Sequence, residues 1–274
     1  MRVAVRRAAH QLLDTPKVLD DPIAVRIIGA EADAALRASL GDQQSRVGRA
    51  VRAFMVARSR FAEDELARAV GRGVAQYVVL GAGLDTFAYR HPYAPGTLRV
   101  FEVDHPGSQA WKRARLAAAA IAIPASVTFA PVDFETQTLA DGLAAAGFAR
   151  DRAAFFSWLG VTMYLTEAAI DATLAFIASL PPGGGVAFDY AVPRASLGLV
   201  ARFALDRLSR RVAAAGEPFV TFFDPGGLRA RLIRHGFHAI QDLGADEINA
   251  RYFGGRADGL RTGGQLGRFA SAER

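Results

Sequence analysis

The chain contains no cysteine among its 274 residues. Disulfide bridges, thiolate metal sites and any mechanism that uses a cysteine nucleophile are therefore excluded. The absence of thiols is compatible with the reducing interior of a cell, and we predict a cytoplasmic location. The first nine residues hold three arginines but no apolar segment of the kind that a secretory signal needs.

Long apolar runs and lysines are also scarce. No run approaches the roughly 18 residues that cross a bilayer, so we expect no contact with a membrane. Lys17 and Lys112 are the only lysines, and arginine supplies the rest of a formal net charge of +6. The arginines are spread over helices that also carry acids, as between Arg58 and Arg68, so we expect no nucleic-acid partner. The positive charge nevertheless favours an anionic substrate by steering.

The hydrophobic pattern of the chain changes near residue 73. Apolar residues at helical spacing predict helices over residues 4–13 and about 43–70, with a short helix after Pro22. From residue 76 onward, short apolar runs alternate with helical stretches, which is typical of a doubly wound, mostly parallel sheet. Strands are expected at residues 77–80, 99–103, 127–132, 153–159, 186–192, 238–243 and 268–272, and further helices at 108–120, 139–146, 167–180, 196–215 and 225–235.

This pattern predicts one α/β domain, Rossmann-like, with a seven-stranded sheet and helices on both faces. We divide it into a helical N-terminal extension (1–72), a cofactor-binding core (73–192), a helical substrate lid (193–235) and C-terminal strands (236–274). The amphipathic segment at 196–215 fits a dimer interface as well as a lid, so a homodimer stays open.

The first strand of the core runs directly into the glycine turn Gly81-Ala82-Gly83, which we expect to lead into a helix. Glycines there allow the backbone to approach a ligand that any Cβ would block, although a tight turn from strand to helix explains the pair equally well. The next strand ends in Glu102-Val103-Asp104, about twenty residues on, where an acid can accept hydrogen bonds from both ribose hydroxyls. Asp104 lies at the open end of that strand and is the better candidate.

The third strand ends in Asp133-Phe134. A carboxylate at Asp133 can accept the amino proton of an adenine, and Phe134 offers an apolar surface beside the ring. Thr86 stands where the dinucleotide fingerprint has its third glycine. S-adenosylmethionine has no phosphate and tolerates this departure, whereas a pyrophosphate needs an unobstructed helix N-terminus. A methyltransferase is therefore favoured over the alternatives, an NAD-dependent oxidoreductase or a non-catalytic protein that binds an adenosyl ligand.

Longer runs carry a resemblance to a known family. They are ARSRFAED at residues 57–64, QYVVLGAGLDTFAYR at 76–90, FEVDHP at 101–106 and WLGVTMYL at 158–165. Nearly the whole chain, from Arg7 to the YFGGR of residues 252–256, resembles the leucine carboxyl methyltransferase family, and within it the bacterial branch of S-adenosylmethionine-dependent O-methyltransferases. Class I methyltransferase architecture and S-adenosylmethionine as cofactor are what the resemblance implies.

The resemblance also implies roles for individual residues. Arg58 would bind the methionine carboxylate, Gly81 in the turn with Gly83 the methionine part, Asp104 the ribose, and Asp133 with Phe134 the adenine. Taken alone, Arg58 would be explained as a solvated helix arginine paired with an acid such as Glu63. Family members often have glutamate where this chain has Leu159, so that detail of the site is not carried over.

Methyl transfer from a sulfonium is an in-line displacement by a nucleophile on the substrate, so the enzyme mainly aligns the reactants and excludes water. An ionised carboxylate needs no general base, whereas a phenol or alcohol does. The five histidines are scattered, no residues have metal-ligand spacing, and we expect no metal. The catalytic residues stay unknown.

Residues and motifs that the sequence lacks exclude some classes of methyl acceptor. Methylation of cytosine C5 needs a cysteine, and methylation of base amino groups uses a Pro-Pro loop that does not follow the fourth strand here. We predict O-methylation of a small-molecule carboxylate or hydroxyl. Tyr164, Tyr252 and Arg256 are candidates for contacting this acceptor, although core packing, turn capping and solvation, respectively, explain them equally well.

Overall fold

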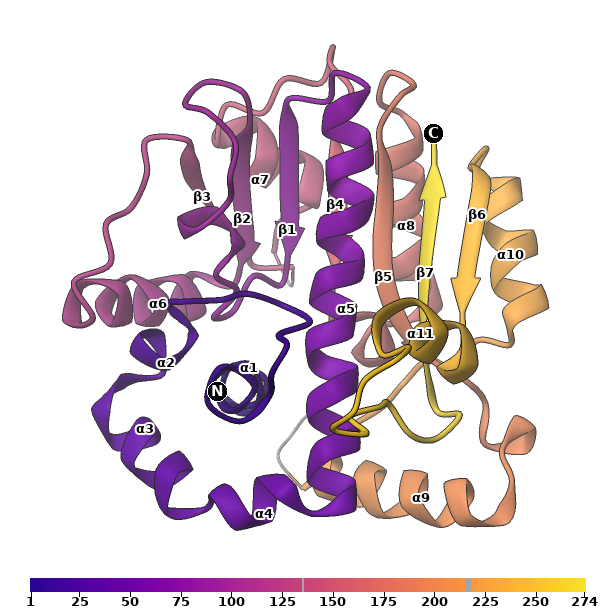
Figure 1. The fold of residues 1–274 in the computed structure, drawn as a ribbon. Coiled ribbons are helices and arrows are strands. Elements are labelled where there is room, and N and C mark those ends of the chain that lie inside the picture. The colour runs from indigo at the N-terminus through magenta and orange to yellow at the C-terminus, as the bar shows by residue number, and fades with distance from the viewer. Residues whose placement is uncertain (135, 215–217) are drawn as a thin grey trace.

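A computed structural model describes residues 1–134, 136–214 and 218–274. Its centre is a seven-stranded sheet with helices on both faces (Figure 1). The strands run in the order β3-β2-β1-β4-β5-β7-β6, and β7 is antiparallel to both of its neighbours. Their bounds are β1 Gln76–Leu80, β2 Arg99–Asp104, β3 Val127–Pro131, β4 Phe155–Trp158, β5 Gly185–Ala191, β6 His238–Leu243 and β7 Gly267–Glu273. The predicted class I methyltransferase sheet is confirmed, and the strand order reverses between β1 and β4, where ligands bind in open α/β sheets.

The longest helix, α5, crosses one face of the sheet in front of β4 and β5 (Figure 1). It begins at Arg46 because the hydroxyl of Ser45 accepts the N–H of Gly48 at 3.0 Å, which caps the helix N-terminus. The helices are α1 Arg2–Leu13, α2 Ala24–Ile27, α3 Gly29–Ala38, α4 Leu40–Gln44, α5 Arg46–Gly71, α6 Pro106–Ala118, α7 Leu139–Ala145, α8 Glu167–Ala178, α9 Leu199–Ala213, α10 Pro225–Arg234 and α11 Ala245–Tyr252. No helix in the described ranges is long and apolar enough to cross a membrane.

Strand residues alternate between two apolar cores, as their period of two requires. Val79 of β1 packs with α5 and α11 on one face, whereas Val78 packs with α7, α8 and α10 on the other. On the α5 side, the rings of Phe61 and Phe269 stack with their centroids 5.6 Å apart. Both faces of the sheet are therefore buried, which explains why its strands are continuous apolar runs.

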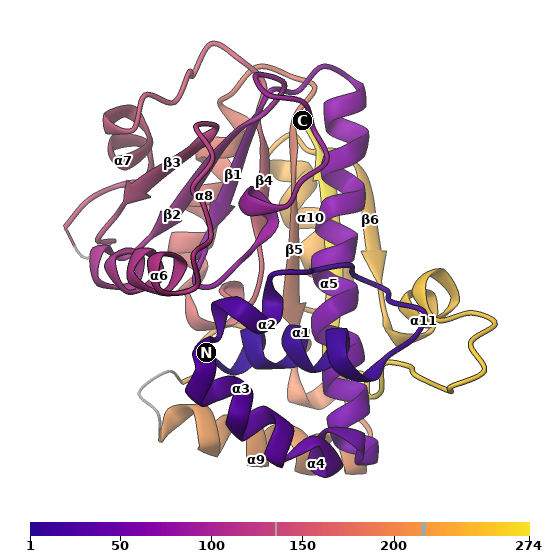
Figure 2. The ribbon, with the colours of Figure 1, turned by 60° about the vertical axis from the view of Figure 1, so that its left-hand side comes forward.

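Helices α1 to α4 gather at the carboxyl ends of the strands (Figure 2). They are fixed to α5 by a buried cluster in which Arg52 donates two hydrogen bonds to Asp14, at 2.7 and 2.8 Å. His10 also binds Asp14 through Nδ1 at 2.8 Å, while its Nε2 accepts the backbone N–H of Val18 at 3.0 Å. The N-terminal extension is thus placed over the edge of the sheet where a ligand would bind.

One prediction about local structure is wrong, and one helix is missing from the prediction. The glycine turn is not followed by an α-helix: residues 81–98 form only a 3-10 turn at Phe87–Tyr89 before β2 begins. The C-terminal part holds α11 as well as strands, and the N-cap of this helix is Gly244, whose N–H donates to the carboxylate of Glu247 at 2.9 Å.

The predicted lid (193–235) contains α9 and α10, and α9 begins three residues later than the helix expected at 196–215. Leu205 of this helix is buried against the core of the α8 face, whereas Leu199 and Phe203 are exposed. Ala215, the last residue of the predicted segment, lies outside the described residues. The role of segment 196–215 as a lid or a dimer surface stays a prediction, as does the division of the chain into four parts.

Candidate functional site

The glycine turn and the end of β2 are joined directly. The backbone N–H of Gly83 donates to Oδ2 of Asp104 at 2.6 Å, and that of His105 donates to Oδ1 at 2.8 Å. Gly81 and Gly83 have φ values of +66° and +44°, a region that disfavours side chains. A Cβ on Gly81 would lie 2.5 Å from Cγ2 of Val161. The structure therefore brings Gly81, Gly83 and Asp104 together, and the turn is closed against the loop after β4.

Asp104 keeps the capacity to bind a ligand. It is partly exposed, and each carboxylate oxygen can accept more than the one backbone N–H that it receives. Glu102, on the same strand face, is fully buried; Nζ of Lys112 lies 2.7 Å from its carboxylate, and the hydroxyl of Tyr89 donates to it at 3.0 Å. Of the two acids at the end of β2, Asp104 is thus the one that a ribose can reach.

Arg58 is buried and does not pair with Glu63. Its Nη1 donates to Oδ2 of Asp189 on β5 at 2.8 Å, whereas Glu63 binds Arg90. Nε of Arg58 is buried without a hydrogen-bond partner in the described part of the chain. A buried guanidinium with a free donor is an unsatisfied group that an anionic ligand can satisfy.

Asp189 and Gly160 are two residues that sequence reasoning missed. Oδ1 of Asp189 accepts the backbone N–H of Gly160 at 2.5 Å, so one carboxylate fixes both Arg58 and the loop after β4. Gly160 has a φ of +73°, and a Cβ there would lie 2.8 Å from Nη1 of Arg58. An acid inside the apolar run of β5 was the available sequence signal for Asp189.

The far side of the site is formed by the end of β3. Asp133 is partly exposed, and its carbonyl accepts the N–H groups of Thr136 and Gln137 at 3.0 and 2.8 Å. Phe134 is 60% exposed, which is unusual for a phenylalanine in a folded chain. The backbone N–H of Val132 donates to the carbonyl of Asp104 at 2.9 Å, so the ends of β2 and β3 are in register beside the glycine turn.

The N-terminal extension fixes the loop that follows the glycine turn. The hydroxyl of Thr86 donates to Asp21 at 2.6 Å, and Asp21 is fully buried. Arg7 donates to the same carboxylate at 3.3 Å and also to the carbonyl of Leu84. Thr86, which stands in place of the third glycine of the dinucleotide fingerprint, thus connects α1 and the segment before α2 to the turn.

The structure shows where the three residues predicted to contact the acceptor lie. Tyr164 is half-buried in the loop after β4, with its ring 5.4 Å from that of Phe219. The hydroxyl of Tyr252 donates to Asp64 of α5 at 3.0 Å, and burial together with that acid raises its pKa. Arg256 is not solvated: it binds Asp258 at 2.6 Å and the carbonyl of Pro16 at 2.5 Å. Contact of any of the three with an acceptor stays a prediction.

Leu159 stands at the position where the resemblance led us to expect a glutamate. It is partly buried and packs against the core of the α5 face, next to the loop that carries Gly160. Leu159 thus contributes apolar packing, and the acid beside Gly160 is Asp189.

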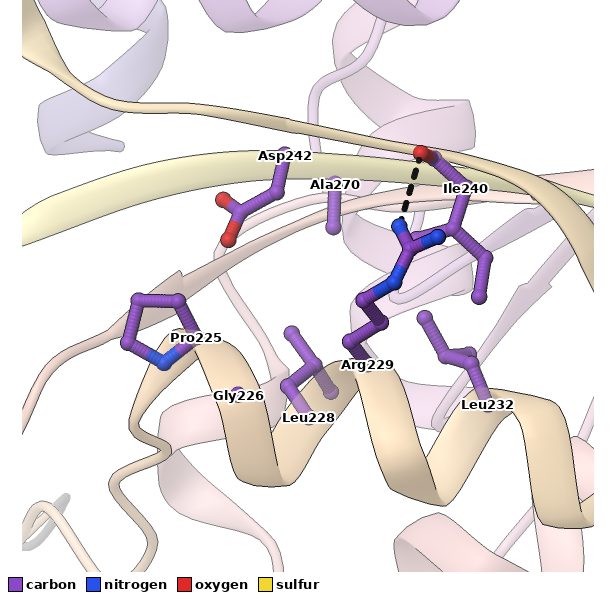
Figure 3. Close-up of a pocket in the computed structure, with 8 residues that line it drawn as sticks. All are labelled: Pro225, Gly226, Leu228, Arg229, Leu232, Ile240, Asp242 and Ala270. Atoms are coloured by element: carbon purple, nitrogen blue, oxygen red, sulfur yellow. Dashed lines mark hydrogen bonds between the residues drawn. The ribbon is translucent and has the colours of Figure 1, made fainter.

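A small hollow of about 210 Å³ lies apart from these residues, between α10 and the edge strand β6 (Figure 3). Leu228 and Leu232 of α10 line it, and Arg229 reaches across to the carbonyl of Ile240 at 3.5 Å. Its walls contain none of the residues at the ends of β1, β2 and β4, so it takes no part in the candidate site.

Comparison with known proteins identifies the family. The model of the leucine carboxyl methyltransferase family matches residues 1–178. The chain belongs to the leucine carboxyl methyltransferase family. It is 31% identical to YktD of Bacillus subtilis, which is provisionally named an S-adenosyl-L-methionine-dependent methyltransferase, over 94% of this chain and 91% of that protein. A similarly named protein of Mycobacterium sp. strain KMS is 40% identical over 49% of this chain and 44% of its own length.

Solved structures support the fold. A protein of Thermobifida fusca, provisionally named a methyltransferase, matches with a TM-score of 0.56 at 18% identity, covering 91% of this chain and 94% of its own. Magnesium protoporphyrin IX methyltransferase of Synechocystis, solved with S-adenosylhomocysteine, matches with a TM-score of 0.51 at 16% identity, covering 93% of this chain and all of its own. At these identities the likeness shows the shared class I methyltransferase fold.

Proposed function

We propose that this member of the family transfers a methyl group from S-adenosylmethionine to an oxygen atom of a small molecule, a carboxylate or a hydroxyl. Family membership makes it an S-adenosylmethionine-dependent methyltransferase, and the oxygen acceptor is the part that we propose. The observation that carries the assignment of the site is the buried Arg58, whose Nη1 is held by Asp189 and whose Nε has no partner among the described residues.

The residues at the strand ends fit the donor. Arg58 would hold the methionine carboxylate, Gly81 would contact the methionine part, Asp104 would accept both ribose hydroxyls, and Asp133 with Phe134 would hold the adenine. When bound, the donor supplies a methyl group on a positively charged sulfur. The residues of the chain orient this group and keep water away from it, which is the main contribution a methyltransferase makes to the displacement.

The short 3-10 turn after the glycines distinguishes this site from a dinucleotide site. A pyrophosphate is bound by the N–H groups and dipole of the helix that follows the glycine turn. Here residues 81–98 contain only the 3-10 turn Phe87–Tyr89, and Thr86 is held by Asp21. This arrangement speaks against an NAD-dependent oxidoreductase.

The family description supports a carboxylate acceptor. Among the histidines, His10 binds Asp14 and the N–H of Val18, Nδ1 of His105 accepts the N–H of Gly107, and His235 binds Asp171. Of the other two rings, His91 packs against Phe87 and Tyr93 without a hydrogen-bond partner among the described residues, and His238 is exposed. We assign none of the five as a general base. A carboxylate is already ionised at neutral pH and needs no such base, and carboxyl methylation is what the family description names.

Calorimetric titration with S-adenosylhomocysteine and NAD tests the donor, and methyl transfer from radiolabelled S-adenosylmethionine to matched panels of carboxylic acids, phenols and amines tests the acceptor. We expect micromolar binding of S-adenosylhomocysteine, no binding of NAD, and label that alkali releases as methanol, because methyl esters are hydrolysed and methyl ethers are not. Label on nitrogen or carbon would contradict the proposal. Binding without any turnover would favour the non-catalytic alternative.

A further inference from the structure

A second concave region lies at the carboxyl end of β5, beyond the residues that fit the donor. It is a cavity of about 870 Å³ between the N-terminal part of α5, the first turn of α11 and the loop that joins α11 to β7. This volume is in the range of small-molecule sites, roughly 300–1,000 Å³. The cavity is therefore large enough for a metabolite or for part of one.

The cavity is lined by residues of the two elements that also carry the Arg58–Asp189 pair. Val192, which lines it, follows β5 three residues after Asp189. Ala50, on the opposite wall, precedes Arg58 on α5 by eight residues, which is about 12 Å along a helix. The start of α5 and the end of β5 thus line the cavity, while Arg58 and Asp189, farther along the same two elements, form the buried pair.

The lining of the cavity is positively charged. Four arginines line it, Arg46, Arg49, Arg261 and Arg268, against the acids Asp246 and Glu247. Arg268 is bound to Asp242 at 2.9 Å, and Arg49 donates to the carbonyl of Asp258. The carboxylate of Glu247 accepts the N–H at the start of its own helix. These three side chains are occupied by the fold.

Arg46 and Arg261 are different. Both are exposed, and within the described ranges neither makes a hydrogen bond or ion pair. Arg46 starts α5, while Arg261 lies on the loop between α11 and β7, so the two guanidinium groups come from separate elements that face the same space. Guanidinium groups bind oxyanions bidentately, and Asp246 is the acid that remains to oppose them.

We propose that this arginine-lined cavity binds an oxyanion group of the methyl acceptor, at a distance from the oxygen that is methylated. The inference rests on the proposed function and adds the acceptor class: a molecule that carries a second anionic group, either a carboxylate or a phosphate. Binding a remote group supplies energy that aligns the reacting oxygen. Acceptors without that group bind weakly.

The first test is a calorimetric titration of the full chain, saturated with S-adenosylhomocysteine at low salt, with citrate and with inorganic phosphate. The test variant is Arg46→Gln/Arg261→Gln. The control is Arg152→Gln/Arg234→Gln, which makes the same change of charge at two exposed arginines outside the cavity. We expect at least tenfold weaker anion binding in the test variant, wild-type affinity in the control, and unchanged affinity for S-adenosylhomocysteine in both.

Equal anion affinity in the two variants, or no anion binding by the wild type, would overturn the inference. Neither result touches the proposed function, which fails instead if S-adenosylhomocysteine does not bind. A second test incubates a small-molecule cell extract with radiolabelled S-adenosylmethionine and passes the product over an anion-exchange resin at pH 7. We expect most of the label to be retained, because the second anionic group stays on the product. Label that flows through as a neutral product contradicts the inference.

Discussion

Asp189 of β5 lies 2.8 Å from the guanidinium of Arg58 on α5 and joins two segments that are 131 residues apart in the chain. Both side chains are nearly inaccessible to solvent. Taking two charges out of water costs more than a well-packed apolar pair would, so stability alone does not explain the pair. The proposed role of Arg58 in the donor site supplies a reason that stability does not.

Removal of one partner should therefore change the free energy of unfolding more than removal of both. Asp189→Ala leaves Arg58 as an uncompensated buried charge and should lower the free energy of unfolding by about 3–5 kcal/mol. The double variant Arg58→Met/Asp189→Leu should regain most of that stability while binding S-adenosylhomocysteine poorly. Urea unfolding and calorimetry measure the two effects. A double variant that is stable and binds with wild-type affinity would show that the pair only supports the fold.

A second prediction concerns Gly81. Gly81→Ala places a methyl group 2.5 Å from Cγ2 of Val161 and forces a residue with a Cβ to a φ of +66°, which costs about 1–2 kcal/mol by itself. Val161→Ala in the same chain removes the clash and should restore part of the stability. If the backbone of Gly81 contacts the methionine part as proposed, affinity for S-adenosylhomocysteine should not return with it, because a residue with a Cβ at a φ of +66° still strains the turn. Recovery of both together would mean that Gly81 serves the turn and not the ligand.

The sequence predicts those parts of the site whose signal lies within a short stretch of the chain. The strands were predictable because both faces of the sheet are covered, which makes each strand an apolar run. Asp104 was predictable because it ends such a run. The pairing of Arg58 with Asp189 was not, because nothing local relates residues 131 positions apart.

The two errors in local structure had signals in the sequence. Pro92 and Pro95 lie in the segment after the glycine turn, and proline lacks the N–H that a continuing helix needs. Gly244 followed by Glu247 is a helix-start signal for α11. In both places a regular alternation of strands and helices predicts the wrong local structure, whereas these individual residues indicate a segment without an α-helix in the first and a helix start in the second.

The third prediction tests Asp104 as the ribose acceptor. Asp104→Ala should weaken binding of S-adenosylhomocysteine by about 1.5–3 kcal/mol, the range for hydrogen bonds to a charged group. The same change frees the N–H groups of Gly83 and His105, so thermal unfolding of the ligand-free variant must be measured beside it. Asp104→Asn keeps an acceptor in place and serves as the milder comparison. Unchanged affinity in Asp104→Ala would remove this residue from the site.

The fourth prediction concerns pH and the cluster that fixes the N-terminal extension. Burial raises the pKa of Asp14, but hydrogen bonds from Arg52 and His10 outweigh it and lower the pKa to about 2. Because the folded-state pKa lies below the ordinary value of 3.8, the ionised carboxylate stabilises the fold above about pH 4. That contribution is lost as the pH falls from 4 toward 2. The difference in unfolding free energy between wild type and Asp14→Asn, measured in urea, should therefore be constant from pH 7 to 5 and shrink below pH 4. A difference that grows with acidity contradicts this account.

The last prediction separates binding from folding at the adenine end of the site. Phe134 is 60% exposed, so Phe134→Ala removes little buried area and should leave the free energy of unfolding within about 0.5 kcal/mol of wild type. If the ring stacks on adenine, the affinity for S-adenosylhomocysteine should fall by about 1–3 kcal/mol, the range for loss of a base-stacking aromatic. Ile233→Ala, at a 54% exposed position on α10, is the matched control and should change neither quantity. Equal affinity in the two variants would place the adenine away from the end of β3, and Asp133 would then lose its predicted role as well.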